Sequence, residues 1–265
     1  KIALVDSDGT EYSYNELLKK TEFINSKIEG GSLILILASN TVESIIGYVA
    51  FIRSKNTSIL LDKSFKTSYV EKITKVYKPN YIFCPKNYFN NIKENYVILS
   101  FQDYVLVRTN YNKHKKINKK NLLLLSTSGT TQNPKFVRLS NLNLYYNTNN
   151  IIKYLKINFK HTTITTMPMA YSYGLSIINT HLLSGSKIVV NNKTIFEREF
   201  WTKLHKYKIT SFGGVPEFYE QLKKLKFEKF HLPDLKYVTQ AGGKIEKGLL
   251  KYFRNICKEK KIKFI

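Results

Sequence analysis

The stretch from Leu122 to Val137 reads LLLLSTSGTTQNPKFV. A short aliphatic run, which predicts a buried strand, leads directly into a turn rich in hydroxyl side chains and then into Pro134 and Lys135. Hydroxyl and exposed backbone N–H groups donate hydrogen bonds to phosphate oxygens, Gly129 permits close approach of the backbone, and Lys135 adds a positive charge. The stretch is not a Walker A loop, because Pro134 stands where that pattern has a second glycine. These residues alone leave two interpretations open, a phosphate-binding loop and an ordinary surface turn.

Strand and helix patterns alternate on both sides of this stretch. Aliphatic or β-branched runs predict strands at residues 33–38, 57–61, 80–84, 122–125, 162–167, 187–190, 209–212 and 235–240. Helices are predicted at residues 42–52, from 68 to near 79, and at 140–155, 174–183, 197–207, 216–225 and 248–258. The expected N-terminal residues of these helices include Asn40 or Thr41, a capping box of Ser68 with Glu71, Ser140 and Pro216. This alternation predicts an α/β fold with a mostly parallel sheet covered by helices on both faces.

The composition is that of a globular protein. The chain has 265 residues, 43% of them hydrophobic and 23% charged, and this length fits one large domain or two small ones. Its longest purely aliphatic run, residues 33–38, is far shorter than the roughly 18 residues that a membrane span needs. Two cysteines, Cys84 and Cys257, make no disulfide scaffold and favour a reducing, cytoplasmic compartment. Because the chain begins at Lys1 rather than at Met, a removed leader stays open.

The charge is strongly positive, with 43 Lys and Arg against 19 Asp and Glu, a net charge of +24. Clustered lysines bind nucleic acids by releasing counterions, so a nucleic-acid-binding protein is one alternative. The lysines are spread along the whole chain, however, and the densest patch, residues 113–120, reads as a solvated loop. A basic surface also attracts ATP, coenzyme A or an acidic carrier protein. We favour these partners over nucleic acid.

Residues 127–137 resemble the phosphate-binding signature of the adenylate-forming (AMP-binding) superfamily, which includes acyl-CoA synthetases and peptide-synthetase adenylation domains. The pattern Ser/Thr-Ser-Gly-Thr-Thr-Gly-x-Pro-Lys-Gly-Val matches at Thr127, Ser128, Gly129, Thr130, Thr131, Pro134, Lys135 and Val137. It departs at Gln132 and Phe136, which are both glycine in the pattern. Other segments are similar to motifs of this family in the same order along the chain, at residues 3–6, 12–17, 167–175, 182–186, 189–190, 215–216 and 235–243.

The resemblance implies that residues 1–265 are an N-terminal AMP-binding (adenylation) domain, incomplete at its C-terminal end, with layered, mostly parallel sheets flanked by helices. It implies an enzyme that uses ATP and Mg²⁺ to turn a carboxylic acid into an acyl-adenylate, and then passes the acyl group to coenzyme A or a carrier protein. The residues implied to bind ATP are Thr127, Ser128, Gly129, Thr130, Thr131, Lys135, Gly242 and Gly243. The residues implied on the side of the acid are Tyr171, Gly174 and Ala241.

No catalytic residue or metal ligand is assigned within the chain. The five histidines are scattered without ligand spacing, and Mg²⁺ is commonly held through substrate phosphates. The resemblance stops at Ile265, before the family's ribose-binding Asp, its metal-binding Glu and the C-terminal domain with its adenylation Lys. From this we expect the sequence by itself to be inactive.

Several alternatives stay open. Residues 167–175 contain no acid to pair with an ammonium group, which favours an uncharged fatty or aryl acid over an α-amino acid. The departures at Gln132 and Phe136 motivate a degenerate homologue that binds nucleotide or acyl ligand without catalysis. For Tyr171 the alternative is a packed core tyrosine, and for Gly242 and Gly243 it is a simple turn.

Overall fold

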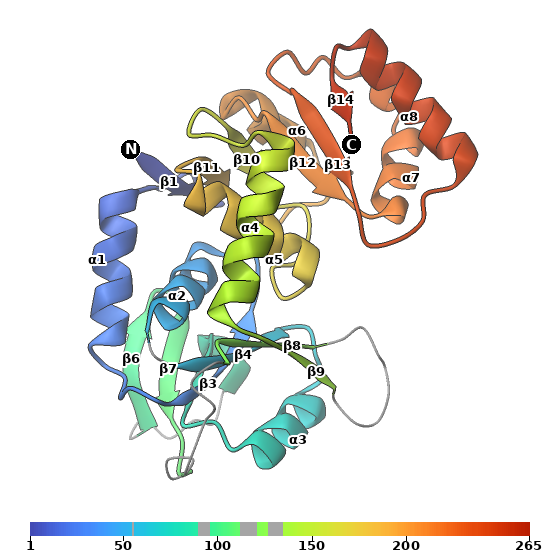
Figure 1. Ribbon diagram of the computed structural model, residues 1–265. Coiled ribbons are helices and arrows are strands. Elements are labelled where there is room, and N and C mark those ends of the chain that lie inside the picture. Colours follow the sequence, from blue (N-terminus) through green and yellow to red (C-terminus); the bar gives the residue numbers. More distant parts are fainter. Residues whose placement is uncertain (55, 90–95, 112–120, 127–134) are drawn as a thin grey trace. The chain divides into compact units, whose positions relative to one another are not determined.

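The computed structural model describes residues 1–54, 56–89, 96–111, 121–126 and 135–265 (Figure 1). These residues form two compact units, each built on one sheet. The first unit contains Lys1, Tyr12–Asn147 and Met169–Ser172. The second unit contains Ile2–Glu11, Thr148–Pro168 and Tyr173–Ile265.

The sheet of the first unit has the strand order β6-β7-β5-β3-β4-β8-β9. Its strands are β3 (Leu33–Ala38), β4 (Thr57–Asp62), β5 (Tyr81–Pro85), β6 (Val97–Phe101), β7 (Tyr104–Arg108), β8 (Leu123–Ser126) and β9 (Phe136–Leu139). β3 pairs in parallel with β4 and β5, and β4 pairs in parallel with β8. β7 and β9 are antiparallel to their neighbours. The centre of the sheet is therefore parallel, as predicted, while each edge carries an antiparallel pair.

The position of β3 explains its aliphatic sequence. All six of its residues are buried, and Leu33, Leu35 and Leu37 pack on one face in a hydrophobic core with Ile59 and Ile73. Alternate residues of a strand point to opposite faces, so a strand that is covered on both faces needs apolar side chains throughout. This is why the run at residues 33–38 predicted its strand correctly.

The helices of the first unit are α1 (Tyr14–Asn25), α2 (Val42–Arg53), α3 (Thr67–Tyr77), the short 3₁₀ helix η1 (Lys86–Phe89) and the beginning of α4 (Asn141–Leu155). Two predicted caps are confirmed. The Thr41 side chain accepts a hydrogen bond from the Ser44 amide at 3.3 Å, and the Ser140 hydroxyl accepts one from the Asn143 amide at 3.1 Å. Each cap satisfies an amide that has no partner within its own helix.

The predicted capping box of Ser68 with Glu71 is wrong. α3 begins at Thr67, and its N-cap residue is Lys66, which makes no side-chain cap hydrogen bond. The Tyr69 amide donates to the Lys66 carbonyl at 2.9 Å, so Ser68 already lies inside the first helical turn. A residue with helical backbone angles cannot take the extended conformation that an N-cap requires.

The sheet of the second unit has the order β14-β13-β12-β10-β11-β1-β2, and β2 is the strand on which the chain leaves this unit. Its strands are β1 (Ile2–Val5), β2 (Glu11–Ser13), β10 (Thr162–Ile164), β11 (Lys187–Val189), β12 (Ser211–Gly214), β13 (Tyr237–Gln240) and β14 (Lys263–Phe264). The neighbours from β1 to β14 pair in parallel. This sheet matches the predicted parallel arrangement.

The helices of the second unit are α5 (Ser172–Leu183), α6 (Arg198–Lys206), α7 (Pro216–Lys224), η3 (Phe227–Lys229) and α8 (Lys247–Glu259). Pro216 is the first residue of α7, as predicted. α6, α7 and α8 bury their apolar faces in one core, in which the rings of Tyr219 and Phe253 lie 5.0 Å apart. Burial of these faces contributes roughly 25 cal/mol for each Å² of apolar surface removed from water.

Five strands were not expected from the sequence, namely β2, β6, β7, β9 and β14. The basic patch at residues 113–120 lies outside the described residues. Within the part of the chain that the structure describes, no helix combines the length and the apolar character that crossing a membrane requires.

Candidate nucleotide and acid site

Residues 127–134 connect β8 to β9. Ser126 pairs with Phe136 across these two strands, and Leu123 pairs with Leu139, so antiparallel pairing places Ser126 and Phe136 side by side. The predicted ATP-binding residues Thr127, Ser128, Gly129, Thr130 and Thr131 lie outside the described residues, as does Gln132. Their role stays a prediction.

Lys135 is the first described residue after this loop, and its side chain is exposed. Because the next residue, Phe136, pairs with Ser126, the register places the Lys135 backbone beside the end of β8. Phe136 itself packs against the ring of Tyr77, with the ring centroids 5.2 Å apart, at the margin of the hydrophobic core of the first unit. The departure from glycine at Phe136 thus has a structural use, since the ring stabilises the strand that carries Lys135.

In the second unit, other residues predicted to bind ATP or the acid lie just after the ends of the parallel strands. β10, β12 and β13 are neighbours that run in the same direction, so the segments after them meet at one side of the sheet, here called the carboxyl edge. β13 ends at Gln240, and Ala241, Gly242 and Gly243 follow directly. The Ala241 amide donates to the carbonyl of Gly214, the last residue of β12, at 3.3 Å. Ligands of open α/β sheets bind outside the carboxyl ends of the strands, which makes this edge the candidate site.

Glycines are required at the carboxyl edge because neighbouring groups fill the space of a side chain. A Cβ atom on Gly213 would lie 2.4 Å from the Tyr173 hydroxyl oxygen, and one on Gly214 would lie 2.3 Å from the Phe218 ring. Gly242 has a φ of 81°, in the left-handed region that residues with a Cβ atom rarely adopt. Gly242 and Gly243 are exposed, so their backbone is accessible to a ligand.

Gly174 is needed for packing within α5. It is buried, and a Cβ atom there would lie 2.2 Å from the carbonyl oxygen of Pro168. This contact involves backbone, which moves less readily than the end of a side chain. Gly174 therefore holds α5 tightly against the segment that follows β10, and a direct contact with the acid stays a prediction.

A network of hydroxyl groups fixes β13 behind the carboxyl edge. The hydroxyls of Tyr173 and Tyr219 both donate to the carbonyl of Thr239, at 2.8 and 2.7 Å, and the Thr239 hydroxyl lies 2.7 Å from that of Tyr173. Burial raises the pKa of Tyr173 to about 12 and that of Tyr219 well above its ordinary value. Both side chains therefore remain neutral donors at physiological pH.

Tyr171 belongs to the first unit, and 41% of its side chain is exposed. Its neighbours Met169 and Ala170 are buried, and the Met169 amide donates to the side-chain oxygen of Asn40 at 3.0 Å. The backbone before Tyr171 is thus anchored while the ring stays accessible. This exposure speaks against the alternative of a packed core tyrosine, but its contact with a substrate stays a prediction.

Three residues of the carboxyl edge were not singled out in the sequence, namely Tyr173, Thr239 and Gln240. The Gln240 side chain donates to the carbonyl oxygens of Gly243 and Ala241, at 2.8 and 3.2 Å, and so shapes the turn after β13. The signal for Gln240 was its place as the last residue of a predicted strand, shortly before a pair of glycines. Among the described residues, no group of three His, Cys, Asp or Glu side chains is arranged to hold a metal ion.

Sequence comparison finds one family along nearly the whole chain. Residues 1–263 match the family described as AMP-binding enzyme. The D-alanine--D-alanyl carrier protein ligase of Listeria welshimeri is 25% identical over 202 residues, which cover 71% of this chain and 39% of that protein. The oxalate--CoA ligase of Arabidopsis thaliana is 26% identical over 132 residues, 48% of this chain and 26% of that protein. The chain thus spans well under half the length of these relatives.

Structure comparison shows the same fold in solved enzymes. O-succinylbenzoate coenzyme A synthetase (MenE) from Bacillus subtilis in complex with AMP has a TM-score of 0.77 and 17% identity, over 99% of this chain and 68% of that chain. A long-chain-fatty-acid-CoA ligase (FadD1) from Archaeoglobus fulgidus has a TM-score of 0.82 and 17% identity, over 100% of this chain and 60% of that chain. At this level of identity, the similarity speaks for the fold alone.

Proposed function

Because the chain belongs to the AMP-binding enzyme family, we propose that it serves the ATP-dependent activation of a carboxylic acid as an acyl-adenylate. The observation that carries the proposal is the family match over residues 1–263, joined to the hydroxyl-rich sequence between β8 and β9. In this proposal residues 1–265 supply the N-terminal AMP-binding part of the enzyme.

The proposed reaction has two steps. A carboxylate oxygen attacks the α-phosphorus of ATP and forms a new P–O bond, while the bond to pyrophosphate breaks and pyrophosphate leaves with the electron pair. A thiolate of coenzyme A or of a carrier protein then attacks the acyl carbon, and AMP leaves. In the first step two anions meet, so the protein contributes chiefly positioning and neutralisation of charge.

Lys135 is the proposed counter-charge for the phosphates of ATP, together with the hydroxyls of Thr127, Ser128, Thr130 and Thr131. The exposed position of Lys135, next to the residue pair of Ser126 and Phe136, fits this task. Mg²⁺ would be shared with the phosphates and would neutralise their charge, and that mode of binding needs no cluster of acidic side chains.

The carboxyl edge is the proposed place of the adenylate and the acid. The exposed backbone of Gly242 and Gly243 would face the nucleotide, and Ala241 would lie on the side of the acid. Gly174 would position the segment before α5. Tyr171, whose ring is accessible within the first unit, is proposed as an acid-binding residue from the family resemblance alone.

For the acid we propose a fatty or aryl acid without an ammonium group. The support is the absence of any carboxylate in residues 167–175, since an ammonium buried there without a partner would cost several kcal/mol. The D-alanyl carrier protein ligases among the relatives make D-alanine the competing candidate. Two free, buried cysteines fit a reducing cytoplasm as the proposed location.

The test is exchange of labelled pyrophosphate into ATP by the full-length gene product that contains residues 1–265, measured separately with fatty acids, aryl acids, oxalate and D-alanine. We expect exchange that depends on a fatty or aryl acid. Exchange that depends on D-alanine would support the proposed adenylation reaction but overturn the proposed class of acid. Protein that is folded and binds ATP but shows no exchange with any acid would overturn the proposed activity in favour of a binding homologue.

A further inference from the structure

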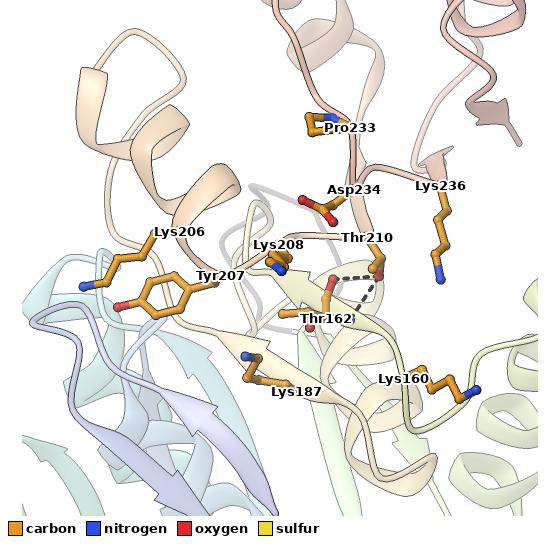
Figure 2. Close-up of a pocket in the computed structure, with 10 residues that line it drawn as sticks. All are labelled: Lys160, Thr162, Lys187, Lys206, Tyr207, Lys208, Thr210, Pro233, Asp234 and Lys236. Atoms are coloured by element: carbon orange, nitrogen blue, oxygen red, sulfur yellow. Dashed lines mark hydrogen bonds between the residues drawn. The ribbon is translucent and has the colours of Figure 1, made fainter.

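A cavity of about 460 Å³ opens at the other end of the parallel strands of the second unit (Figure 2). Thr162 and Lys187 are the first residues of β10 and β11, while Thr210 and Lys236 directly precede β12 and β13. Because these four strands are parallel neighbours, their first residues share one side of the sheet, here called the amino edge. The volume is that of a site for a small molecule.

The cavity is strongly basic. Of the residues that the structure describes, five lysines and one carboxylate lie around it, namely Lys160, Lys187, Lys206, Lys208, Lys236 and Asp234. Among the described residues, no carboxylate lies within 4.0 Å of any of these five ammonium groups. Like charges that share a concave site repel one another and together create a positive potential, so an anion bound there would relieve an unfavourable arrangement.

The backbone that carries these lysines is held firmly in place. The Lys187 amide donates to the carbonyl of His161 at 3.1 Å, and the Lys236 amide donates to that of Thr210 at 2.8 Å. The amide and carbonyl of Thr162 both bond to the hydroxyl of Thr210, at 3.0 and 2.9 Å. The lysine stems are flexible, but their origins are positioned before any ligand binds, which lowers the entropic cost of binding.

We propose that this lysine cavity binds a small anion that carries two or more phosphate groups. Figure 2 shows the lysine side chains distributed around Thr162 and Thr210 rather than gathered at one point, which suits several separate charges better than a single phosphate. A lysine ammonium is a compact charge with three donors, and it binds phosphate oxygens without the fixed planar geometry of arginine. The cavity is distinct from the carboxyl edge, where the adenylate is proposed.

The first test is calorimetric titration of the 265-residue chain with tripolyphosphate. The variant Lys187→Gln/Lys208→Gln removes two cavity charges, and Lys251→Gln/Lys258→Gln removes two from the exposed surface of α8 as a matched control. We expect the dissociation constant to rise at least about tenfold in the cavity variant and less than about twofold in the control. Equal weakening in both variants, or no binding by the parent chain, would overturn the proposal.

A second measurement separates the cavity from the proposed ATP loop, which also binds phosphates. Acetylation of lysines, read by mass spectrometry, should slow at Lys187 and Lys208 when tripolyphosphate is added, and should not slow at Lys251. The protection should persist in a Lys135→Ala variant, whether or not the protein catalyses exchange. If protection is confined to the peptide that contains Lys135, or is lost in Lys135→Ala, the lysine cavity is not a separate phosphate-binding site.

The source of the phosphates is distinguished by further probes. Stronger binding of tripolyphosphate, ATP or inositol hexakisphosphate than of AMP would support recognition of several phosphates, and the order among the first three identifies the source. AMP binding as strongly as tripolyphosphate would overturn the requirement for two or more phosphates. An oligonucleotide that binds more tightly than all of them, and loses affinity in the cavity variant, would overturn a small ligand.

Discussion

The two edges of the sheet in the second unit are made of opposite chemistry. The carboxyl edge is built from glycines, neutral hydroxyls and backbone, with Tyr173 and Thr239 hydrogen-bonded behind it. The amino edge is built from lysines that extend from firmly paired strand ends, and among the described residues that line its cavity Asp234 is the one carboxylate. The carboxyl edge lets a ligand approach the backbone closely, whereas the amino edge attracts a ligand by its positive charge.

This difference shows how one sheet separates two kinds of recognition. Close approach requires that side chains be absent, so substitution at the carboxyl edge creates overlap with packed atoms. Attraction of anions requires only charge at roughly the right place, so substitution at the amino edge leaves the fold intact and changes the electrostatic potential. The four variants below test this contrast, from the largest expected effect to the smallest.

Gly174→Ala should have the largest effect. Its Cβ atom would lie 2.2 Å from the Pro168 carbonyl oxygen, and backbone must shift to make room. We expect the free energy of unfolding to fall by about 3 kcal/mol, measured by urea denaturation. Gly30→Ala is the matched control, because a Cβ atom at Gly30 meets nothing within 4 Å, and its effect should stay within about 0.5 kcal/mol. Equal losses in the two variants would contradict the close-packing account.

The buried imidazole of His181 should make stability depend on pH. The Nε2 atom of His181 lies 3.5 Å from the hydroxyl oxygen of Ser211, the first residue of β12. Burial lowers the pKa of His181 from 6.5 to about 4. Between these pH values the unfolded chain binds a proton that the folded chain excludes, so stability falls as the pH falls. Replacing His181 with Asn should remove about 2 kcal/mol of the loss between pH 7 and pH 5. The control His205→Gln, at an exposed histidine, should leave the loss of stability between pH 7 and pH 5 unchanged. If His181→Asn also leaves it unchanged, His181 is not the group responsible.

Tyr173→Phe should have a moderate effect on the carboxyl edge. It removes the hydroxyl that donates to the Thr239 carbonyl at 2.8 Å, although the Tyr219 hydroxyl still donates to the same oxygen. We expect a loss of about 1 kcal/mol in thermal or urea unfolding. Tyr154→Phe, at a tyrosine of α4 that is 75% exposed, should be neutral. A neutral Tyr173→Phe would mean that the network does not stabilise β13.

Lys236→Gln should have the smallest effect and leave stability unchanged. Burial lowers the pKa of His161, and the positive charge of Lys236 lowers it further. Removing that charge should therefore raise the pKa of His161 slightly, as measured by NMR titration of the imidazole. Lys251→Gln on α8 is the control and should not move it. If the pKa of His161 is the same in Lys236→Gln as in the parent chain, the charge of Lys236 does not act on His161.

Much of the fold could be predicted from the sequence, and the reasons are local. Strands such as β3 are buried on both faces and so are apolar throughout, and the helices between them begin at residues such as Ser140 and Pro216. β6 and β7 were not predicted because the turn between them has no glycine or asparagine as a signal. Its left-handed residue is Gln102, with a φ of 51°. The capping box at Ser68 failed because a side-chain pattern does not determine where the first turn of a helix begins.

The candidate site was predictable only in part. The hydrogen bond from the Ala241 amide to the Gly214 carbonyl and the network at Thr239 depend on strand register, which no local pattern reports. The lysine cavity was not predictable either, because its residues come from positions 160 to 236 and only the parallel register brings them to one edge. In the sequence they were part of a general positive charge.

The most direct test of the central claim uses the full-length gene product that contains residues 1–265. It compares acid-dependent pyrophosphate exchange in its Lys135→Ala and Lys187→Gln/Lys208→Gln variants. The account predicts that Lys135→Ala lowers the exchange rate about a hundredfold, because it removes a charge that neutralises the phosphates of ATP in the transition state. The cavity variant, which changes only the amino edge, should keep nearly the full rate. Full exchange in Lys135→Ala, or loss of exchange in the cavity variant alone, would contradict the account.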